Sequence, residues 1–499
     1  MSLNNNYFIY KKTSMRKYRL FFFIILASLC NPLIGQINLQ ESVDYFTSDQ
    51  VNKNASITIQ VIDLDSDSIL AQSNEYTSLM CASTAKLFST SSAMKLLGNN
   101  YRAQTRFYTS GLIDSMGILH GDLWIRGGGD VSLGSKYFNE EGAEFDFMTD
   151  WLDSLKSHGI HGINGRLITD ASEFGYAGVP DGWDWSDMGN YYGVGASGIN
   201  FFDNTLKYYF HTGNPGEKVE LLATLPEIPN VFFQHDIKAE NIRRDLSYIY
   251  GSPFSNVRFG RGSLPAYKDS FCVKGSIPDP ELQLSIDFKS FLAAHSFDVN
   301  GESTANRFLL TPHPSFDSLH FIFSYTGEKL IDIVNKTNLY SVNLFAEGLL
   351  NLTGYKYSGF GSTKSGINAV YRLIKKDVDL SGLSIKDGSG LSRKNAVSAS
   401  HFCQLLKGIY KSDIYDDFKG SLSVAGNKGT LKSVCRNQKG ANRIYAKSGT
   451  LSNVKAYSGY VQTVSGKNLA FAVIANNFNC SKSQIVKKME RVFNAMASY

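Results

Sequence analysis

A serine and a lysine three residues apart, Ser83 and Lys86, open an apolar segment that continues to Leu97. The segment predicts a helix, and on a helix positions i and i+3 share one face, so the lysine amine reaches the serine hydroxyl. An amine held neutral by its surroundings takes the hydroxyl proton and creates a nucleophile. Backbone N–H groups at a helix start also favour negative charge. The pair therefore predicts acyl transfer by a serine nucleophile.

Spacing alone does not select this pair. Three other serines stand three residues before a lysine: Ser14 before Lys17, Ser92 before Lys95, and Ser452 before Lys455. Ser83 follows a strand-turn-strand pattern and lies at a helix start, whereas Ser92 lies inside the same helix. Ser14 precedes an export signal, and no helical pattern surrounds Ser452. Position in the fold therefore favours Ser83.

Ser341 and Asn343 are separated by a single valine. Both side chains can project toward one cleft from a tight connection, where the hydroxyl relays a proton and the amide grips a substrate amide. Taken alone, Ser341 is better explained as a helix N-cap. Ser341 and Asn343 therefore indicate a catalytic function only in combination with the other motifs.

Residues 447–450 (Lys-Ser-Gly-Thr) lie on a strand-like run. A lysine on a strand supplies a fixed charge, and Gly449 leaves the backbone open to an approaching ligand. The N–H of Thr450 can then form an oxyanion hole with the N–H of Ser83. A similar Lys-Ser-Gly at 364–366 leads into a helical stretch and is better explained as a helix entry.

The elements that position these residues are strands near both ends of the chain and helices between them. Alternating apolar and polar residues predict strands over 56–64, 69–72, 443–447, 454–463 and 468–474. Helical periodicity covers 83–97, 327–334, 341–352, 365–376, 399–410 and 483–497. We expect the apolar stripe of the last helix to pack on the preceding sheet rather than on a membrane.

The middle of the chain, from 101 to about 314, consists of short β-like runs between Gly-, Asp- and Asn-rich turns. The pattern predicts an α/β core with an antiparallel sheet and helices, interrupted by a large, mainly β insertion. The expected domains are a signal peptide (1–35), the first part of the core (36–100), the inserted part (101–314) and the second part of the core (315–499).

Composition is that of a folded, multidomain protein. The chain has 499 residues, of which 43% are hydrophobic, and a formal net charge of +5. No dense Lys/Arg stripe with interleaved aromatic residues is present, so nucleic-acid binding has no support. The mild positive charge suits an anionic polymer, and surface solvation explains it equally well.

The N-terminal region predicts export. A basic block at 15–19 precedes an apolar run at 20–29, which is too short to span a bilayer. Gly35 offers a small residue for cleavage, and either Met1 or Met15 is a possible start. Lipidation at Cys30 is disfavoured because Leu29 stands where a small residue is needed. We expect a secreted or periplasmic protein with at most peripheral membrane association.

The sequence implies no metal and no cofactor. Five cysteines, an odd number, remain after residue 35, without a close pair, so neither a disulfide framework nor a zinc site is indicated. His158 and His161 form the only close histidine pair and suit a surface turn.

In chain order, the motifs at 83–86, 341–343 and 447–449 resemble those of the penicillin-recognising serine peptidase and β-lactamase superfamily. Two further stretches resemble signatures of the class C low-molecular-mass penicillin-binding proteins, the D-Ala-D-Ala carboxypeptidase/endopeptidase family S13: 387–393 (DGSGLSR) and 424–431 (VAGNKGTL). Segments 127–130, 182–185 and 191–193 are similar to parts of that family's inserted domain. Ser341 lies 258 positions after Ser83, as a family with inserted domains between these motifs requires.

The resemblance implies a penicillin-sensitive enzyme that acts on peptidoglycan peptides and binds β-lactam antibiotics. Ser83 would be the nucleophile, Lys86 the base, and Ser341 with Lys447 the donor to the departing amine. Substrate-binding residues carried over from the family are the following: Asn343, Lys447, Ser448, Gly449, Thr450, Arg393 and Asp187.

Three positions depart from the family pattern. Cys81 stands where proline is usual and, beside the nucleophile, would be open to oxidation. Ser448 replaces threonine and keeps the hydroxyl. Lys428 replaces aspartate, and the sequence does not explain it.

Two alternatives remain open on the sequence alone. A β-lactamase or esterase of the same fold would release its acyl group quickly, whereas a peptidase retains a penicilloyl group. A catalytically silent cell-wall-binding protein would not need all three motifs intact. The sequence decides neither the balance of carboxypeptidase and endopeptidase activity nor the oligomeric state.

The inserted part carries an unusual cluster at 183–187 (Trp-Asp-Trp-Ser-Asp). A structural turn whose tryptophans are buried against the β domain explains it slightly better than function does. The resemblance implies the alternative, that Asp187 reaches over the cleft to a free amine of the stem peptide.

Overall fold

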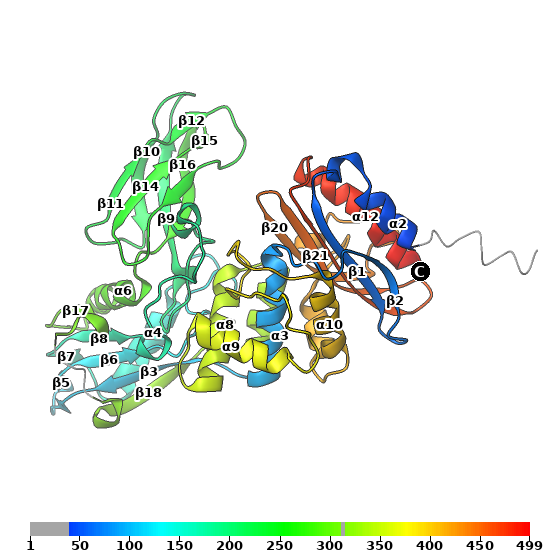
Figure 1. The fold of residues 1–499 in the computed structure, drawn as a ribbon. Coiled ribbons are helices and arrows are strands. Elements are labelled where there is room, and N and C mark those ends of the chain that lie inside the picture. Colours follow the sequence, from blue (N-terminus) through cyan, green and yellow to red (C-terminus); the bar gives the residue numbers. More distant parts are fainter. Residues whose placement is uncertain (1–38, 311–314) are drawn as a thin grey trace, which may run out of the picture.

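The computed structural model describes residues 39–310 and 315–499, so the expected signal peptide and Cys30 lie outside the described residues. A six-stranded antiparallel sheet forms the core, in the order β19-β20-β21-β22-β1-β2 (Figure 1). The strands are β1 (Ser56–Asp63), β2 (Ile69–Ser73), β19 (Ser423–Val424), β20 (Ile444–Leu451), β21 (Val454–Gln462) and β22 (Asn468–Asn476).

The sheet joins the two ends of the described chain. Strand β1 pairs with β22 along its whole length, from Ser56 opposite Asn476 to Asp63 opposite Leu469. Nearly all residues of β21 and β22 are buried, because helices cover both faces of the sheet. The sequence-based expectation of adjacent C-terminal strands in a sheet that uses both ends is confirmed.

One face of the sheet packs against α2 (Leu39–Thr47) and α12 (Lys482–Ser498), which lie side by side in Figure 1. The apolar stripe of α12 is buried in the same cluster as the sheet residues Phe471 and Val473. The stripe therefore packs on the sheet, as expected. No described helix is long and apolar enough to cross a membrane.

The other face carries the helices around the expected nucleophile. They are α3 (Lys86–Leu97), α7 (Leu330–Tyr340), α8 (Asn343–Ser358), α9 (Thr363–Ile374), α10 (Ala399–Tyr410) and α11 (Tyr415–Ser421). Helix α3 is the central one, and residues 86–94 are all buried. A helix buried on every side is rigid, so it fixes the position of its first residue, Lys86.

The inserted part begins with β3 and has its own core, separate from that of the six-stranded sheet. Its main sheet has the order β17-β8-β6-β3-β18. The strands are β3 (Gln104–Thr109), β6 (Leu123–Arg126), β8 (Leu167–Asp170), β17 (Ser303–Ala305) and β18 (His320–Thr326). Helices α4 (Asp146–Ser157) and α6 (Pro280–Ala294) pack against this sheet.

The inserted part does not end at residue 314, as the sequence led us to expect, because strand β18 also belongs to it. This strand pairs with β3 from His320 opposite Thr109 to Thr326 opposite Gln104. The inserted part therefore extends through Thr326. No local pattern indicated this pairing, because the partner of β18 lies about two hundred residues earlier in the chain.

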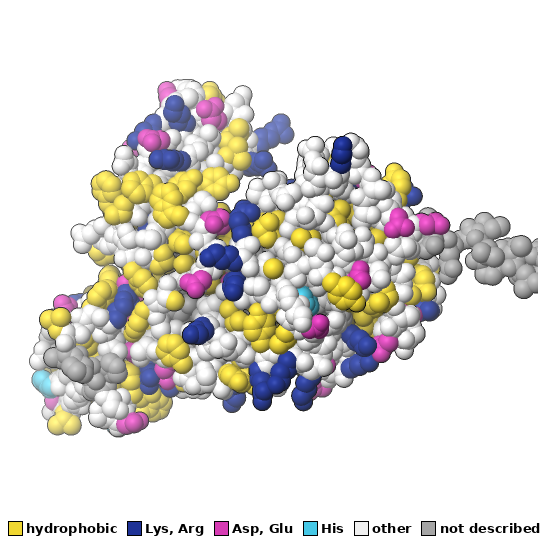
Figure 2. All heavy atoms as spheres, viewed as in Figure 1, with side chains coloured by type: hydrophobic (Ala, Val, Ile, Leu, Met, Phe, Trp, Pro, Cys, Tyr) yellow, Lys and Arg dark blue, Asp and Glu magenta, His cyan; other side chains and the backbone are white. Residues whose placement is uncertain are grey.

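A second lobe of the inserted part projects away from the core at the upper left of Figure 1. It contains a sheet of β10 (Glu220–Leu225), β9 (Thr205–Thr212) and β16 (Lys268–Ser276). A second sheet consists of β11 (Phe232–His235), β14 (Val257–Arg261) and β13 (Tyr248–Tyr250), and β12 (Lys238–Glu240) pairs with β15 (Ser263–Pro265). Figure 2 shows basic and acidic side chains mixed over the visible face, without a continuous basic stripe.

Candidate active site

Ser83 and Lys86 lie where the chain leaves a 3₁₀ turn (Ala82–Ala85) and enters α3. The lysine Nζ lies 3.0 Å from Ser83 Oγ. Lys86 is fully buried, whereas Ser83 is half-buried. The helix expected from residue 83 starts at Lys86, and the nucleophile occupies the tighter turn before it.

Three acceptors surround the Lys86 amine. Besides Ser83, the Oδ1 of Asn343 lies at 2.6 Å and the carbonyl oxygen of Ser389 at 2.7 Å. Burial lowers the pKa of Lys86 to about 7, against the opposing effect of the Asp387 and Glu347 carboxylates. A neutral amine has two hydrogens and one lone pair. With the hydrogens donated to Asn343 and Ser389, the lone pair is directed at the Ser83 hydroxyl.

Two buried carboxylates hold the loop that carries Ser389. Glu347, on α8, accepts hydrogen bonds from the N–H groups of Gly388 and Ser389, at 3.0 and 2.8 Å. Burial raises the pKa of Glu347, and the nearby Asp387 raises it further.

Asp387 fixes the other side of the same loop. It accepts from the N–H groups of Gly390 and Ser392, and from the Asn395 amide. The DGSG sequence therefore serves to present the Ser389 carbonyl to Lys86.

Ser341 sits between α7 and α8 in a left-handed conformation, with φ of 63°. Its Oγ accepts a hydrogen bond of 2.9 Å from Lys447 Nζ, on β20. Val342, not Ser341, precedes the first residue of α8, so the N-cap explanation does not hold. A non-glycine residue in this region is uncommon and is typically held there by its surroundings.

Lys447 is fully buried, and its Nζ also donates to the Ser448 carbonyl at 2.9 Å. Burial lowers its pKa well below the usual range, and repulsion from Lys86 and Lys455 lowers it further. Burial thus favours the neutral form of Lys447 more than in an exposed lysine, an effect that residue type alone does not indicate.

Two glycines allow close packing against the nucleophile. A Cβ on Gly449 would lie 2.6 Å from the Cys81 carbonyl oxygen and 3.1 Å from the Ser83 nitrogen. A Cβ on Gly390 would lie 1.9 Å from the Ala82 carbonyl oxygen. Strand β20 and the DGSG loop therefore both touch the turn that carries Ser83.

The segment at 424–431 acts on the site through Thr430. Ser448 Oγ donates to Thr430 Oγ1 at 2.8 Å, and the N–H of Thr430 donates to Ser423 Oγ. This chain of hydroxyl groups fixes the Ser448 rotamer. Lys428, which departs from the family pattern, is exposed and donates to the Gly420 carbonyl at 3.0 Å.

The inserted part reaches the site through Tyr192. The Asn343 Nδ2 donates to the Tyr192 carbonyl at 2.8 Å, and the Tyr192 hydroxyl donates to Asp187 Oδ1 at 3.2 Å. Burial raises the pKa of Asp187. Asp187 lies on α5 (Trp185–Met188) and is thus connected to Asn343 through one residue.

The two tryptophans of the cluster at 183–187 have different environments. Trp183 is buried, and its Nε1 donates to Asp387 Oδ2 at 2.8 Å. Trp185 is 54% exposed and packs against Tyr250 of the projecting lobe. The expectation that both are buried against the β domain is therefore wrong. Arg393 is at the surface, where its Nε donates to Asp184 at 3.1 Å.

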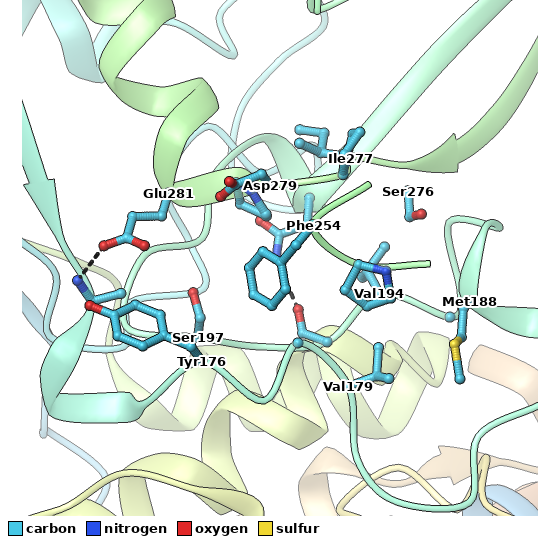
Figure 3. A pocket seen from close by; sticks show the side chains of 18 of the residues that line it. Tyr176, Val179, Met188, Val194, Ser197, Phe254, Ser276, Ile277, Asp279 and Glu281 are labelled. Atoms are coloured by element: carbon cyan, nitrogen blue, oxygen red, sulfur yellow. Dashed lines mark hydrogen bonds between the residues drawn. The ribbon is translucent and has the colours of Figure 1, made fainter. Parts of the chain in front are cut away.

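A small apolar cavity of about 40 Å³ lies behind the segment that carries Asp187 (Figure 3). Met188 and Val194, which flank this segment, point toward it together with Phe254 and Ile277. Deeper in the wall, Arg307 pairs with Asp279 and Glu281.

The prediction that Cys81 is open to oxidation is wrong. Cys81 is fully buried, and burial raises the pKa of its thiol to about 12. Because oxidants attack the exposed thiolate, Cys81 does not make the site sensitive to oxidation.

The sequence pattern did not indicate the contacts made in the site by these residues: Glu347, Ser389, Thr430, Tyr192 and Trp183. All but Glu347 lie in the family-like stretches described above. Glu347 is a buried acid in an apolar helix, and Ser389 contacts Lys86 through its backbone carbonyl rather than its side chain. Only the family-like DGSG stretch pointed to this loop.

Comparisons with known proteins agree with this geometry. A model of the D-Ala-D-Ala carboxypeptidase 3 (S13) family matches residues 39–496. The chain is 23% identical to D-alanyl-D-alanine carboxypeptidase DacB of Haemophilus influenzae, over 98% of this chain and 100% of that one. It is 26% identical to the D-alanyl-D-alanine carboxypeptidase of an Actinomadura species, over 88% and 81%.

The crystal structure of penicillin binding protein 4 (dacB) from Haemophilus influenzae has a TM-score of 0.78 to this chain at 21% identity. The match covers 93% of this chain and 100% of that one. The fold expected from the motifs, a penicillin-recognising α/β core interrupted by an insertion, is thereby confirmed.

Proposed function

The chain belongs to the D-Ala-D-Ala carboxypeptidase 3 (S13) family, and from that premise we propose how its residues act on peptidoglycan stem peptides. The protein is a serine-type D-Ala-D-Ala carboxypeptidase. Ser83 attacks the carbonyl of the penultimate D-alanine and forms an acyl-enzyme. The hydrogen bond between Lys86 and Ser83 is the observation that carries this proposal.

Lys86 acts as the base. Its pKa of about 7 leaves much of the amine neutral near neutral pH, and its hydrogens are engaged by Asn343 and Ser389. The Ser83 proton passes to the lysine as the serine oxygen bonds to the carbonyl carbon. The N–H groups of Ser83 and Thr450 would stabilise the oxyanion, a role that the close packing of Gly449 on Ser83 supports.

The departing amine takes a proton through Ser341, whose hydroxyl accepts from Lys447. In the carboxypeptidase reaction this amine is that of D-alanine, and in an endopeptidase reaction it belongs to a neighbouring stem. Water then hydrolyses the acyl-enzyme. Asn343 orients the peptide, and Ser448 with Lys447 receives the terminal carboxylate.

Specificity for the stem peptide would come from the inserted part. The chemistry of Asp187, a half-buried carboxylate connected to Asn343 through Tyr192, suits a free amine on the peptide side chain. Arg393 is exposed beside Asp184 and suits a substrate carboxylate at the rim. Substrates of this kind imply a location in the cell envelope, which the sequence of the N-terminal region favours.

A fluorescent penicillin tests the proposal. We expect a stable covalent adduct on Ser83 and release of D-alanine from a pentapeptide. Loss of the label within seconds would instead indicate a β-lactamase. Absence of both labelling and D-alanine release would leave only a cell-wall-binding protein.

A further inference from the structure

A basic hollow lies beside the active site, in the inserted part of the chain. A cavity of about 520 Å³ is lined by two lysines and four tyrosines, among other residues: Lys136, Lys274, Tyr137, Tyr191, Tyr192 and Tyr248. A smaller cavity of about 270 Å³ shares Lys136 and Lys274 and adds Lys207. Lys136 and Lys274 thus face both cavities.

Two contacts join this hollow to the catalytic residues. The Tyr192 carbonyl accepts from the Asn343 amide. The Tyr137 ring stacks on Tyr340 with centroids 5.6 Å apart, and Tyr340 directly precedes Ser341. The lining of the hollow therefore contacts Asn343 directly and also contacts Tyr340, the residue before Ser341.

Without a bound anion, the positive charges of Lys136, Lys207 and Lys274 repel one another. Lys274 on β16 and Lys207 on β9 stand directly opposite each other in the antiparallel pair. Like charges in this position are destabilising. Burial lowers the pKa of Lys136, and repulsion from Lys274 and Lys207 adds to this effect.

Neighbouring carboxylates form ion pairs with only two of these three lysine amines. Lys207 lies 3.4 Å from Glu144, and Lys136 lies 3.7 Å from Asp203. In the described parts of the chain, no carboxylate lies within 4.0 Å of the Lys274 amine. Lys274 is half-buried on a strand, so its amine stays near the hollow.

The other acids at the hollow do not fill this gap. Asp245 lines the larger cavity, but Ser247 occupies one of its oxygens through both N–H and Oγ. Glu141 lines the smaller cavity and is exposed.

We propose that Lys274 and Lys136 form a subsite for a substrate carboxylate distant from the scissile bond. The inference rests on the proposed peptidase function and adds to it a second recognition point. Stem peptides carry such a group as the α-carboxylate of a γ-linked glutamate, and a cross-linked peptide carries further carboxylates on its second stem. Tyrosine rings beside the lysines suit the apolar parts of the same chain.

The test compares Lys274→Gln and Lys136→Gln with Lys268→Gln. Lys268 is an exposed lysine on the same strand as Lys274 and lines neither cavity, so its replacement is the matched control. The substrates are a pentapeptide with a free glutamate α-carboxylate, the same peptide with that group amidated, and a cross-linked dimer of the amidated peptide. Acylation by benzylpenicillin reports whether the catalytic residues remain intact.

We expect kcat/KM to fall about fivefold or more for Lys274→Gln on at least one carboxylate-bearing substrate, as removal of a partly exposed charge contact does. A loss confined to the non-amidated pentapeptide assigns the carboxylate to the scissile stem, and a loss confined to the dimer assigns it to the second stem. Penicillin acylation and the Lys268→Gln variant should match wild type.

Equal losses on all three substrates, or none on any, would overturn the subsite. If the Lys274→Gln protein fails to fold, Lys136→Gln still tests the subsite, because replacement of either lysine should produce the selective loss of kcat/KM. A wild-type protein that neither binds penicillin nor releases D-alanine would instead refute the proposed function, and the two failures are therefore distinguishable.

Discussion

The indole N–H of Trp183 donates to Asp387 Oδ2 over 2.8 Å and so joins the inserted part to the loop that holds Lys86. Asp387 also accepts from the N–H of Ser392 at 2.6 Å. The Ser389 carbonyl, from the same loop, accepts from Lys86. Along this path, Asp387 and Ser389 separate Trp183 of the inserted part from Lys86, the proposed base.

Trp183→Phe should reduce stability and slow acylation together. The change keeps the ring but leaves Asp387 with one hydrogen bond fewer, which costs about 2 kcal/mol for a buried charged acceptor. We expect a lower Tm and a smaller rate of penicillin acylation. Trp185→Phe is the control, because Trp185 is half-exposed and its contact with Tyr250 needs only a ring. Equal effects of both changes would contradict the role of the hydrogen bond.

Ser83→Ala should abolish both penicillin labelling and D-alanine release. Ser92→Ala should leave both near wild type, because Ser92 lies inside α3 and its buried hydroxyl has no hydrogen-bond partner within residues 39–310 and 315–499. Mass spectrometry of the intact protein after penicillin treatment gives the measurement. A labelled Ser83→Ala protein would remove Ser83 from the mechanism.

The acylation rate should rise with pH through about 7. Burial lowers the pKa of Lys86 to that value, and only the neutral amine accepts the Ser83 proton, so the active fraction increases as pH rises. Lys86→Ala should lose roughly a hundredfold or more of the rate and, with it, this pH-dependent limb. Stopped-flow acylation between pH 5 and 9 measures both. If the acylation rate of Lys86→Ala still rises with pH in the same way, another group is responsible for the titration.

Gly390→Ala should inactivate the site without unfolding the core. The added Cβ would meet the Ala82 carbonyl oxygen at 1.9 Å, and φ is +82°, so the turn before Ser83 must shift. Gly359→Ala is the control, since φ is +76° there and, apart from adjacent backbone, no atom of the described residues lies within 4 Å of the new Cβ. Both variants carry a backbone penalty of about 1 kcal/mol, and only the first should lose penicillin acylation.

Asp187→Asn should lower kcat/KM for a stem peptide with a side-chain amine and leave penicillin acylation unchanged. A carboxylate attracts the ammonium group, whereas the amide keeps the hydrogen bond from Tyr192 and loses the charge. Asp181→Asn, at an exposed aspartate in the same segment, is the control. Equal losses with a peptide that lacks the amine would leave only a structural role for Asp187.

The sequence predicted the core of the fold because its signals are local. Alternation located β21 and β22 within one or two residues, and helical periodicity located α10 at Ala399–Tyr410. A short motif at a helix start predicted Ser83 as the nucleophile and Lys86 as its base.

Contacts between distant segments could not be predicted in this way. The pairing of β18 with β3 and the Trp183–Asp387 hydrogen bond depend on three-dimensional packing. The second acceptor of Lys86 is a backbone carbonyl, and every residue has one, so the sequence carries no sign of it. Burial also lowers the pKa of Lys447, and residue type alone does not indicate this effect.

The arrangement of the central sheet has a consequence for synthesis of the protein. Strand β1 is translated early, yet it pairs with β22, and Lys447 on β20 also comes from the last part of the chain. A ribosome must therefore complete almost the whole polypeptide before the serine meets its partners. Partly synthesised chains cannot react with penicillin or cut peptides, so the activity begins only once the C-terminal strands have emerged.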